Sequence, residues 1–231
     1  MDTQKLSALE DAIGVVFRDK NILLQALTHR SYLNENTNWH LDHNERLEFL
    51  GDAVLELVVT EYLYTTYPNP EGELTNWRAA LVNAIMLAEV SASFQLNDFI
   101  LLSRGEAKDT GRARQYILAN AIEAVIGAIY LDQGYEVAKV FITRFVIAEM
   151  PRVLKEKLYK DAKSLFQEEA QDRVGVTPAY EVLEEWGPDH ARQFKVGVFL
   201  DKELIGQGEG PSKQEAQQMA ARDGLHKKGW L

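Results

Sequence analysis

Residues 43–55 read His-Asn-Glu-Arg-Leu-Glu-Phe-Leu-Gly-Asp-Ala-Val-Leu, and the organisation of the chain can be worked out from this segment. Its acids, Glu45, Glu48 and Asp52, are three, four and seven residues apart, so a helix would carry all three on one face. The positions between them are mostly apolar, and like charges so placed repel one another. The segment therefore predicts a helix over 43–66 whose acids either face water or bind a hard divalent cation, which prefers oxygen ligands.

A further acid, Glu123, lies in the otherwise apolar segment 117–131. An unpaired buried carboxylate is costly, so Glu123 needs a partner, and an ion pair with Arg46 or Arg78 is one solution. Asn120 lies one turn earlier on the same helical face. Small residues surround both positions and would allow another helix to approach closely.

If the helix expected over 114–132 packs on the helix over 43–66, Glu48, Asp52, Asn120 and Glu123 converge. Three carboxylates and one amide oxygen suit Mg²⁺, which can activate water and stabilise charge on a phosphate. A carboxylate-bridged di-iron site would need Glu-x-x-His pairs, and the sequence contains none.

The composition bounds the class of protein. The 231 residues carry a net charge of −10, which argues against a nucleic-acid binder, but residues 1–150 alone account for −9 of it. The chain has no cysteine, and residues 1–10 lack the basic start and apolar core of a secretory signal. The apolar run at 117–131 is too short and too polar to cross a bilayer. We expect a cytoplasmic protein without membrane contact or a small-molecule cofactor.

The apolar periodicity predicts two domains. An all-α domain over 1–153 has helices over 4–17, 20–28, 43–66, 73–96, 114–132 and 135–157, with loops at 34–40 and 103–113. A linker over 154–160 leads to a small α+β module over 161–231. This module has the order α-β-β-β-α, with helices over 161–173 and 212–228 and strands over 177–185, 192–200 and 203–210.

The chain resembles the bacterial ribonuclease III family in several motifs. The nine-residue core Asn44-Glu-Arg-Leu-Glu-Phe-Leu-Gly-Asp52 is similar to its signature, and Glu71-Gly-Glu-Leu, Arg104-Gly-Glu106 and the segment 117–132 match it in order. The C-terminal module resembles a double-stranded RNA-binding domain through Gly187-Pro-Asp-His190, Gly206-Gln-Gly-Glu-Gly210 and Ser212-Lys213. Together these matches cover nearly the whole chain.

The resemblance implies a Mg²⁺-dependent endoribonuclease, with Mn²⁺ able to replace Mg²⁺. It would cut double-stranded RNA, such as rRNA precursors and other structured RNA, to 5′-phosphate and 3′-hydroxyl ends. The catalytic residues would be Asp52 and Glu123, and the metal ligands Glu48, Asp52, Asn120 and Glu123. Glu45 and Glu71 would be supporting acids. The family works as a homodimer, in which Phe49 would contact the partner, although Phe49 could also belong to the intramolecular core.

The resemblance also implies how the module holds an A-form duplex, which proteins read mainly by shape. The expected RNA-binding residues are Gln167, Glu168, Gln171, His190, Ser212 and Lys213. Arg104, Arg112 and Arg114 lie in a polar segment that could contact the RNA backbone or form a solvated loop. The family usually has a second Lys after Lys213, where this chain has Gln214-Glu215, so we expect fewer phosphate contacts and weaker binding.

Asn120 is the main departure, because the family usually has Asp there. An amide oxygen can still bind a metal, but it carries no charge and cannot accept a proton as a carboxylate does. This leaves open an alternative, a non-cleaving double-stranded RNA-binding protein on the same fold. An acidic helical adaptor that binds no RNA is disfavoured by the C-terminal module.

Overall fold

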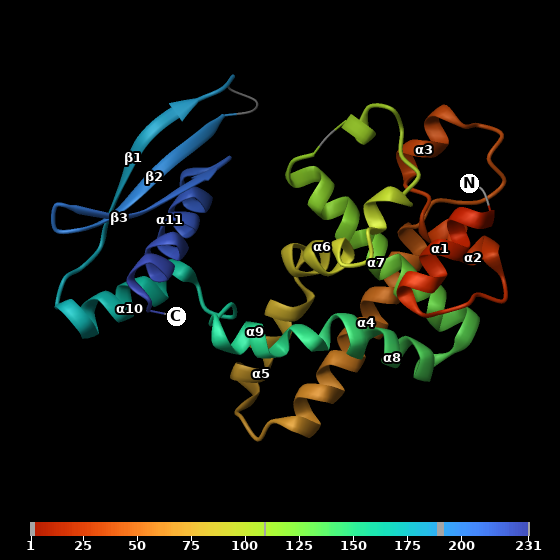
Figure 1. Ribbon diagram of the computed structural model, residues 1–231, viewed down its shortest axis with the longest axis horizontal. Helices are drawn as coiled ribbons and strands as arrows, with labels where there is room; N and C mark the ends of the chain where they lie inside the picture. The colour runs from red at the N-terminus through yellow and green to blue at the C-terminus, as the bar shows by residue number, and fades with distance from the viewer. Residues whose placement is uncertain (1–2, 109, 189–191, 231) are drawn as a thin grey trace. The chain divides into compact units, whose positions relative to one another are not determined.

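The computed structural model describes residues 3–108, 110–188 and 192–230, and His190 therefore lies outside the described residues. The chain divides into two compact units, Met1–Pro151 and Arg152–Leu231. Residues 154–160, the expected linker, group with the second unit. The order of helices and strands confirms the predicted fold class, an all-α unit followed by a small α+β unit (Figure 1).

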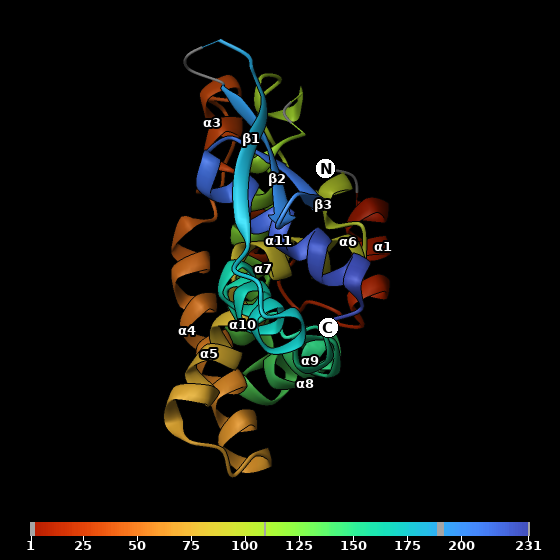
Figure 2. The same ribbon diagram turned by 90° about the vertical axis from the view of Figure 1, so that its left-hand side faces the viewer.

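The first unit is built from helices. They are α1 Thr3–Ile13, α2 Lys20–Ala26, α3 Arg30–Glu35, α4 Glu45–Thr66, α5 Glu71–Val82, α6 Ala84–Ala92, α7 Arg112–Gln133 and α8 Tyr135–Phe145, with α9 Met150–Lys155 at the junction of the units. Short 3₁₀ turns lie at Leu96–Asp98, Glu106–Lys108 and Ile147–Glu149. α7 is the central helix: between Ala119 and Ile129 all residues are buried except Asn120 and Glu123, which are partly exposed, and α2, α4, α6 and α8 pack around it (Figures 1 and 2).

The single helix expected over 73–96 is wrong, because it breaks at Asn83. The Asn83 backbone is extended, and its side chain caps two helices at once. Its Oδ1 accepts a hydrogen bond from the Met86 N–H at 3.0 Å, while its Nδ2 donates to the carbonyls of Ala79 and Ala80 at 3.2 and 3.0 Å. Side-chain caps of this kind satisfy the free backbone groups at helix ends, so two shorter helices replace one.

The structure also differs from the expected helices elsewhere. The helix predicted over 135–157 is interrupted after Phe145 by the 3₁₀ turn Ile147–Glu149 and resumes as α9. The short helix α3 had not been predicted, and it begins where the His29 side chain accepts a hydrogen bond from the Ser31 N–H at 3.3 Å. A histidine cap is a weak sequence signal, because Ser, Thr, Asp and Asn are the preferred capping residues.

The second unit is a three-stranded antiparallel sheet in the order β1-β2-β3, with two helices against one face. Its elements are α10 Ala162–Val174, β1 Ala179–Trp186, β2 Gln193–Leu200, β3 Glu203–Gly210 and α11 Lys213–Lys228 (Figure 1). α11 lies directly on β3, because a Cβ on Gly208 would come within 2.2 Å of the Ala220 nitrogen. The core between sheet and helices includes Phe166, Val196, Val198 and Leu225.

Candidate active site

The site forms where α4 crosses α7, and two glycines set the distance between these helices. A Cβ on Gly51 would lie 1.7 Å from the Glu123 carbonyl oxygen, and a Cβ on Gly127 would lie 2.2 Å from that of Leu47. Neither position can hold a larger residue at this separation. The contact brings the α4 turn that carries Glu48 and Asp52 against the α7 turn that carries Glu123.

Glu48, Asp52, Asn120 and Glu123 come together at this crossing. Burial, and then the charges of Asp52 and Glu48, raise the pKa of Glu123 to about 8. Burial, followed by the charges of Glu45 and Asp52, also raises the pKa of Glu48, and a hydrogen bond from the Asn120 side chain opposes that rise. The carboxylates are therefore close enough to repel one another.

The donor types fit a hard divalent cation. All four side chains offer oxygen atoms as ligands. Within the described residues, none of the three carboxylates forms an ion pair. The salt bridge of Glu123 to Arg46 or Arg78 that the sequence allowed is therefore not formed. In the same residues, no three acidic or histidine side chains are already arranged to hold one ion. A cation would therefore have to draw these side chains inward.

The proposed supporting acids lie in different places. Glu45 begins α4 and is exposed, with Arg30 Nη1 3.4 Å away and His43 Nδ1 3.8 Å away. Glu45 helps to raise the pKa of Glu48, so it borders the site. Glu71 instead begins α5, where its Oε1 accepts a hydrogen bond from Thr75 Oγ1 at 2.9 Å. It lines a pocket together with Thr60, which lies about two helical turns beyond Asp52 along α4. The structure does not bring Glu71 to the site of its own chain.

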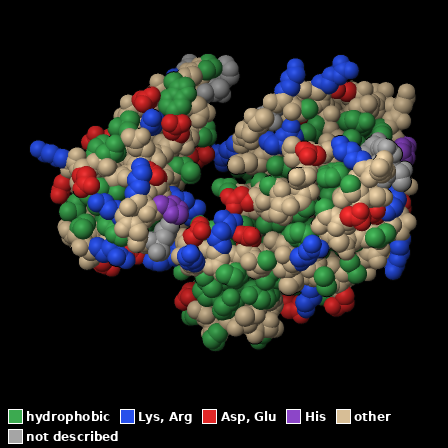
Figure 3. Space-filling model, in the orientation of Figure 1, with side chains coloured by type: hydrophobic (Ala, Val, Ile, Leu, Met, Phe, Trp, Pro, Cys, Tyr) green, Lys and Arg blue, Asp and Glu red, His purple; other side chains and the backbone are tan. Residues whose placement is uncertain are grey.

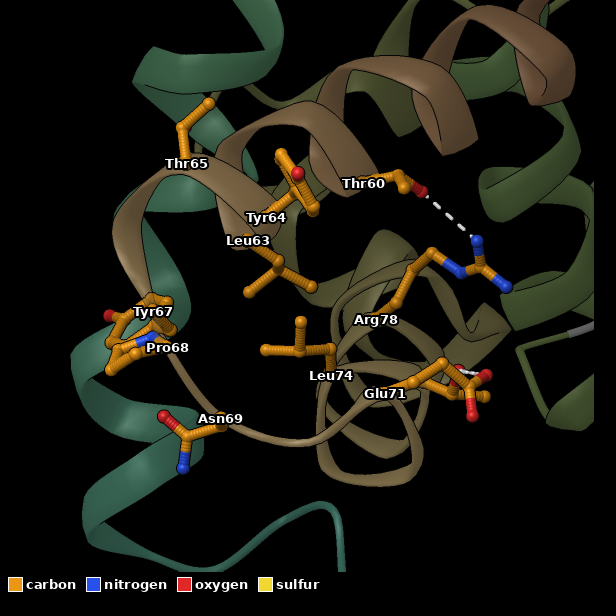
Figure 4. Close-up of a pocket in the computed structure, with 11 residues that line it drawn as sticks. Thr60, Leu63, Tyr64, Thr65, Tyr67, Pro68, Asn69, Glu71, Leu74 and Arg78 are labelled. Atoms are coloured by element: carbon orange, nitrogen blue, oxygen red, sulfur yellow. Dashed lines mark hydrogen bonds between the residues drawn. The ribbon is translucent and has the colours of Figure 1, made fainter.

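Glu71 lines a pocket of about 820 Å³ between the end of α4 and the start of α5 (Figure 4). Leu63, Tyr64 and Leu74 form its apolar side. At its polar side, Arg78 donates to Thr60 Oγ1 at 3.0 Å and pairs with Glu56 at 2.9 Å. Figure 3 shows hydrophobic side chains gathered at the surface around the α4–α5 turn. Helical periodicity does not predict this pocket, and the only local signal for it is the break at Tyr67-Pro-Asn-Pro70 after α4.

Phe49 is 81% exposed, so it does not belong to the core of its own chain. It follows Glu48 directly and precedes Asp52 by three residues on the same helix. Leu57 and Tyr64 on the same helix are also exposed, at 57 and 80%, so α4 presents several large apolar side chains to solvent, as interaction surfaces do.

In the second unit, α10 exposes Gln167, Glu168 and Gln171. Ser212 caps α11: its Oγ accepts a hydrogen bond from the Glu215 N–H at 3.2 Å and lies 3.2 Å from Glu215 Oε1. The Lys213 ammonium lies 5.6 Å from the centre of the Phe194 ring, which orients it at the N-terminus of α11.

No helix within the described residues is both long and apolar enough to span a membrane.

The chain is similar to known proteins along nearly its full length. Residues 19–150 match the Ribonuclease-III-like family, and residues 162–228 match the double-stranded RNA binding motif. Ribonuclease 3 of Campylobacter jejuni is 43% identical over 99% of this chain and 100% of that protein. Ribonuclease 3 of Carboxydothermus hydrogenoformans is 45% identical over 97% of this chain and 96% of its own.

A solved structure supports the same conclusion for the first unit. The nuclease domain of ribonuclease III from C. jejuni superposes with a TM-score of 0.57 at 44% identity, covering 63% of this chain and 99% of that one. Its description concerns flexibility in a region involved in dimer formation. The helical nuclease unit and the RNA-binding unit therefore occur in the family's order, and the chain belongs to the ribonuclease III family of double-strand-specific endoribonucleases.

Proposed function

We propose that this chain hydrolyses phosphodiester bonds of double-stranded RNA at the α4–α7 crossing, leaving 5′-phosphate and 3′-hydroxyl ends. The observation that supports this most strongly is the convergence of three mutually repelling carboxylates at the Gly51–Gly127 contact. Carboxylates held together without a cationic partner are suited to binding a cation. The natural substrates would be rRNA precursors and other structured RNA.

Glu48, Asp52, Asn120 and Glu123 would hold Mg²⁺, for which Mn²⁺ can substitute. When bound, such an ion activates water and stabilises charge on the phosphate. The chain itself fixes the acids on two helices whose separation cannot vary, because glycines meet backbone oxygens there. The charge of Asp52 acts on Glu123 across the crossing, and these two acids would be the catalytic pair. Glu45 would support them from the rim.

Asn120 has a role that an Asp could not fill. Its amide donates a hydrogen bond to the Glu48 carboxylate and favours the ionised form of Glu48. An ionised Asp at this position would instead add a further negative charge. Asn120 therefore stabilises the acid cluster before a cation binds, but contributes less charge afterwards.

The same chain would act as a homodimer through the exposed side of α4. Phe49, Leu57 and Tyr64 are 81, 57 and 80% exposed along that helix. A two-fold axis near Leu57 would place Phe49 of one subunit opposite Tyr64 of the other, at the mouth of the α4–α5 pocket. Glu71 lines that pocket, so the dimer would bring it near the partner's acid cluster.

The second unit would hold the duplex through Gln167, Glu168 and Gln171 on α10, Ser212 and Lys213 at the start of α11, and His190. Exposed amides and acids suit the 2′-hydroxyls of a minor groove, and a helix N-terminus with Lys213 suits a phosphate. The nuclease domain (1–153), linker (154–160) and RNA-binding domain (161–231) remain our proposed boundaries.

The test is cleavage of a long RNA duplex with Mg²⁺ and with EDTA, using the parent chain, Glu123→Gln and Asn120→Asp. We expect Mg²⁺-dependent cutting by the parent and its loss in Glu123→Gln. Duplex binding without cutting by the parent, restored by Asn120→Asp, would instead establish the non-cleaving alternative. Failure of both the parent and Asn120→Asp to cut would sink the catalytic proposal.

A further inference from the structure

Helix α10, which is proposed to face RNA, carries acids that would repel the RNA phosphates. Its sequence includes Glu168, Glu169 and Asp172, and Glu168 lies among the residues proposed to touch RNA. A duplex bears about one negative charge per 1.7 Å of its axis, so uncompensated carboxylates on this helix would repel it. The net charge of the second unit does not solve this problem, because only cations within about 8–10 Å act strongly in physiological salt.

The segment before α10 supplies those cations. The chain turns sharply after α9: Leu158 N–H donates to the Val153 carbonyl at 3.0 Å, Lys160 N–H donates to the Lys157 carbonyl at 3.0 Å, and Lys157 has a left-handed backbone with φ of 49°. This turn folds the linker back along α10.

Two lysines of the turn pair with the two neighbouring acids of α10. Lys157 Nζ lies 2.7 Å from Glu169 Oε1, and Lys160 Nζ lies 2.8 Å from Glu168 Oε2. Arg173 Nε also pairs with Glu169, at 2.7 Å. Glu169 is only 16% exposed and is shared between two cations, whereas Glu168 is 59% exposed and has Lys160 alone among the described cations. The hydrogen bond to Glu168 also raises the pKa of Lys160.

We propose that Lys160 is a positioning residue for duplex binding, which cancels the charge of Glu168 and fixes its carboxylate on the RNA-facing side of α10. The inference rests on the proposed function. It makes the linker turn a working part of the RNA-binding surface. A purely structural ion pair at this exposure would contribute little to folding and would have no effect specific to RNA.

The experiment measures affinity of the full chain for a defined RNA duplex in EDTA, at about 0.05 M and about 0.5 M salt. The variants are Lys160→Glu, Lys160→Gln, Glu168→Gln and the Lys160→Gln/Glu168→Gln pair. The matched control is Lys227→Glu on α11, where Lys227 Nζ pairs with Asp223 at 2.7 Å beside β3. Lys227→Glu reverses one charge in the same unit, as Lys160→Glu does, but at a site beside β3 and away from α10.

We expect Lys160→Glu to weaken binding about tenfold at low salt and about twofold at high salt, because screening removes the repulsion. Lys227→Glu should stay within about twofold of the parent. In Mg²⁺, Lys160→Glu should raise KM for the same duplex and leave kcat unchanged. The double neutral variant should regain the affinity that Lys160→Gln loses, because the charge to be cancelled is gone.

Two results would overturn the inference. Equal effects of Lys160→Glu and Lys227→Glu would mean that the pair has no special place in binding. A double variant as weak as Lys160→Gln would mean that Lys160 meets a phosphate itself and does not act through Glu168. A parent chain that binds no duplex at all would overturn the proposed function and this inference with it.

Discussion

At the scale of single residues, Glu123 couples folding to pH. Its pKa is raised to about 8 from an ordinary value near 4.5, so the folded state binds a proton that the unfolded state releases. In EDTA, the contribution of Glu123 to the free energy of unfolding should be highest below about pH 4.5. It should fall by about 2–4 kcal/mol as the pH rises from about 4.5 to about 8. Urea denaturation across this range measures the effect.

The control for that prediction is Glu123→Gln, which keeps the size and polarity of the side chain but cannot ionise. Its stability should show a much flatter dependence on pH over the same interval. A parent and variant with parallel pH profiles would show that Glu123 does not carry the effect.

Asn120→Asp should have opposite effects on stability and on activity. Without a cation, the new carboxylate loses the hydrogen bond to Glu48 and adds repulsion, so we expect about 1–2 kcal/mol of destabilisation in EDTA. With Mg²⁺, the added charge should tighten metal binding and raise the cleavage rate severalfold. Calorimetric titration with Mg²⁺, beside thermal unfolding in EDTA, separates the two effects. A rise in EDTA stability would contradict the assigned role of Asn120.

At the scale of helices, the α4–α7 crossing should not tolerate a methyl group. Gly51→Ala places a Cβ on the Glu123 carbonyl and must push the helices apart, so we expect a loss of about 3 kcal/mol and of metal affinity. Gly72→Ala on α5 is the matched control, because a Cβ there meets nothing within 4 Å. Its stability should change by no more than about 1 kcal/mol, in the favourable direction. Denaturant unfolding of both variants checks the contrast.

The helices also show what the sequence alone could predict. The α4 pattern, the acid spacing and the small residues of α7 predicted two packed helices, and the alternation in 177–185 and 192–200 predicted β1 and β2, because each signal is local and periodic. Asn83 is a preferred capping residue, but the apolar periodicity of 73–96 continues past it without a break, so that periodicity predicted one helix where the extended Asn83 backbone separates two. The sequence also did not show that Glu71 lies away from the acids of its own chain, because spacing within a helix gives no distance between helices.

At the scale of the whole molecule, Phe49→Ala should shift the protein from dimer to monomer. The ring is 81% exposed in one chain, and burying it in a partner's pocket is worth about 2–3 kcal/mol per subunit. Light scattering over a dilution series measures the change. Val140→Ala is the control, an exposed apolar residue on α8, outside the stripe on α4. A Phe49→Ala protein with the parent's dimer affinity would contradict the proposed interface.

The position of Phe49 within α4 has a consequence for how the enzyme responds to dilution. The ring is one residue from Glu48 and three from Asp52, so the turn that would meet the partner in the proposed dimer also carries the acids. Subunit separation would expose that turn to water and remove the partner's Glu71. Turnover per chain should therefore fall at low protein concentration and recover when the protein is concentrated again. The protein concentration would then set the activity of each chain as well as the amount of enzyme.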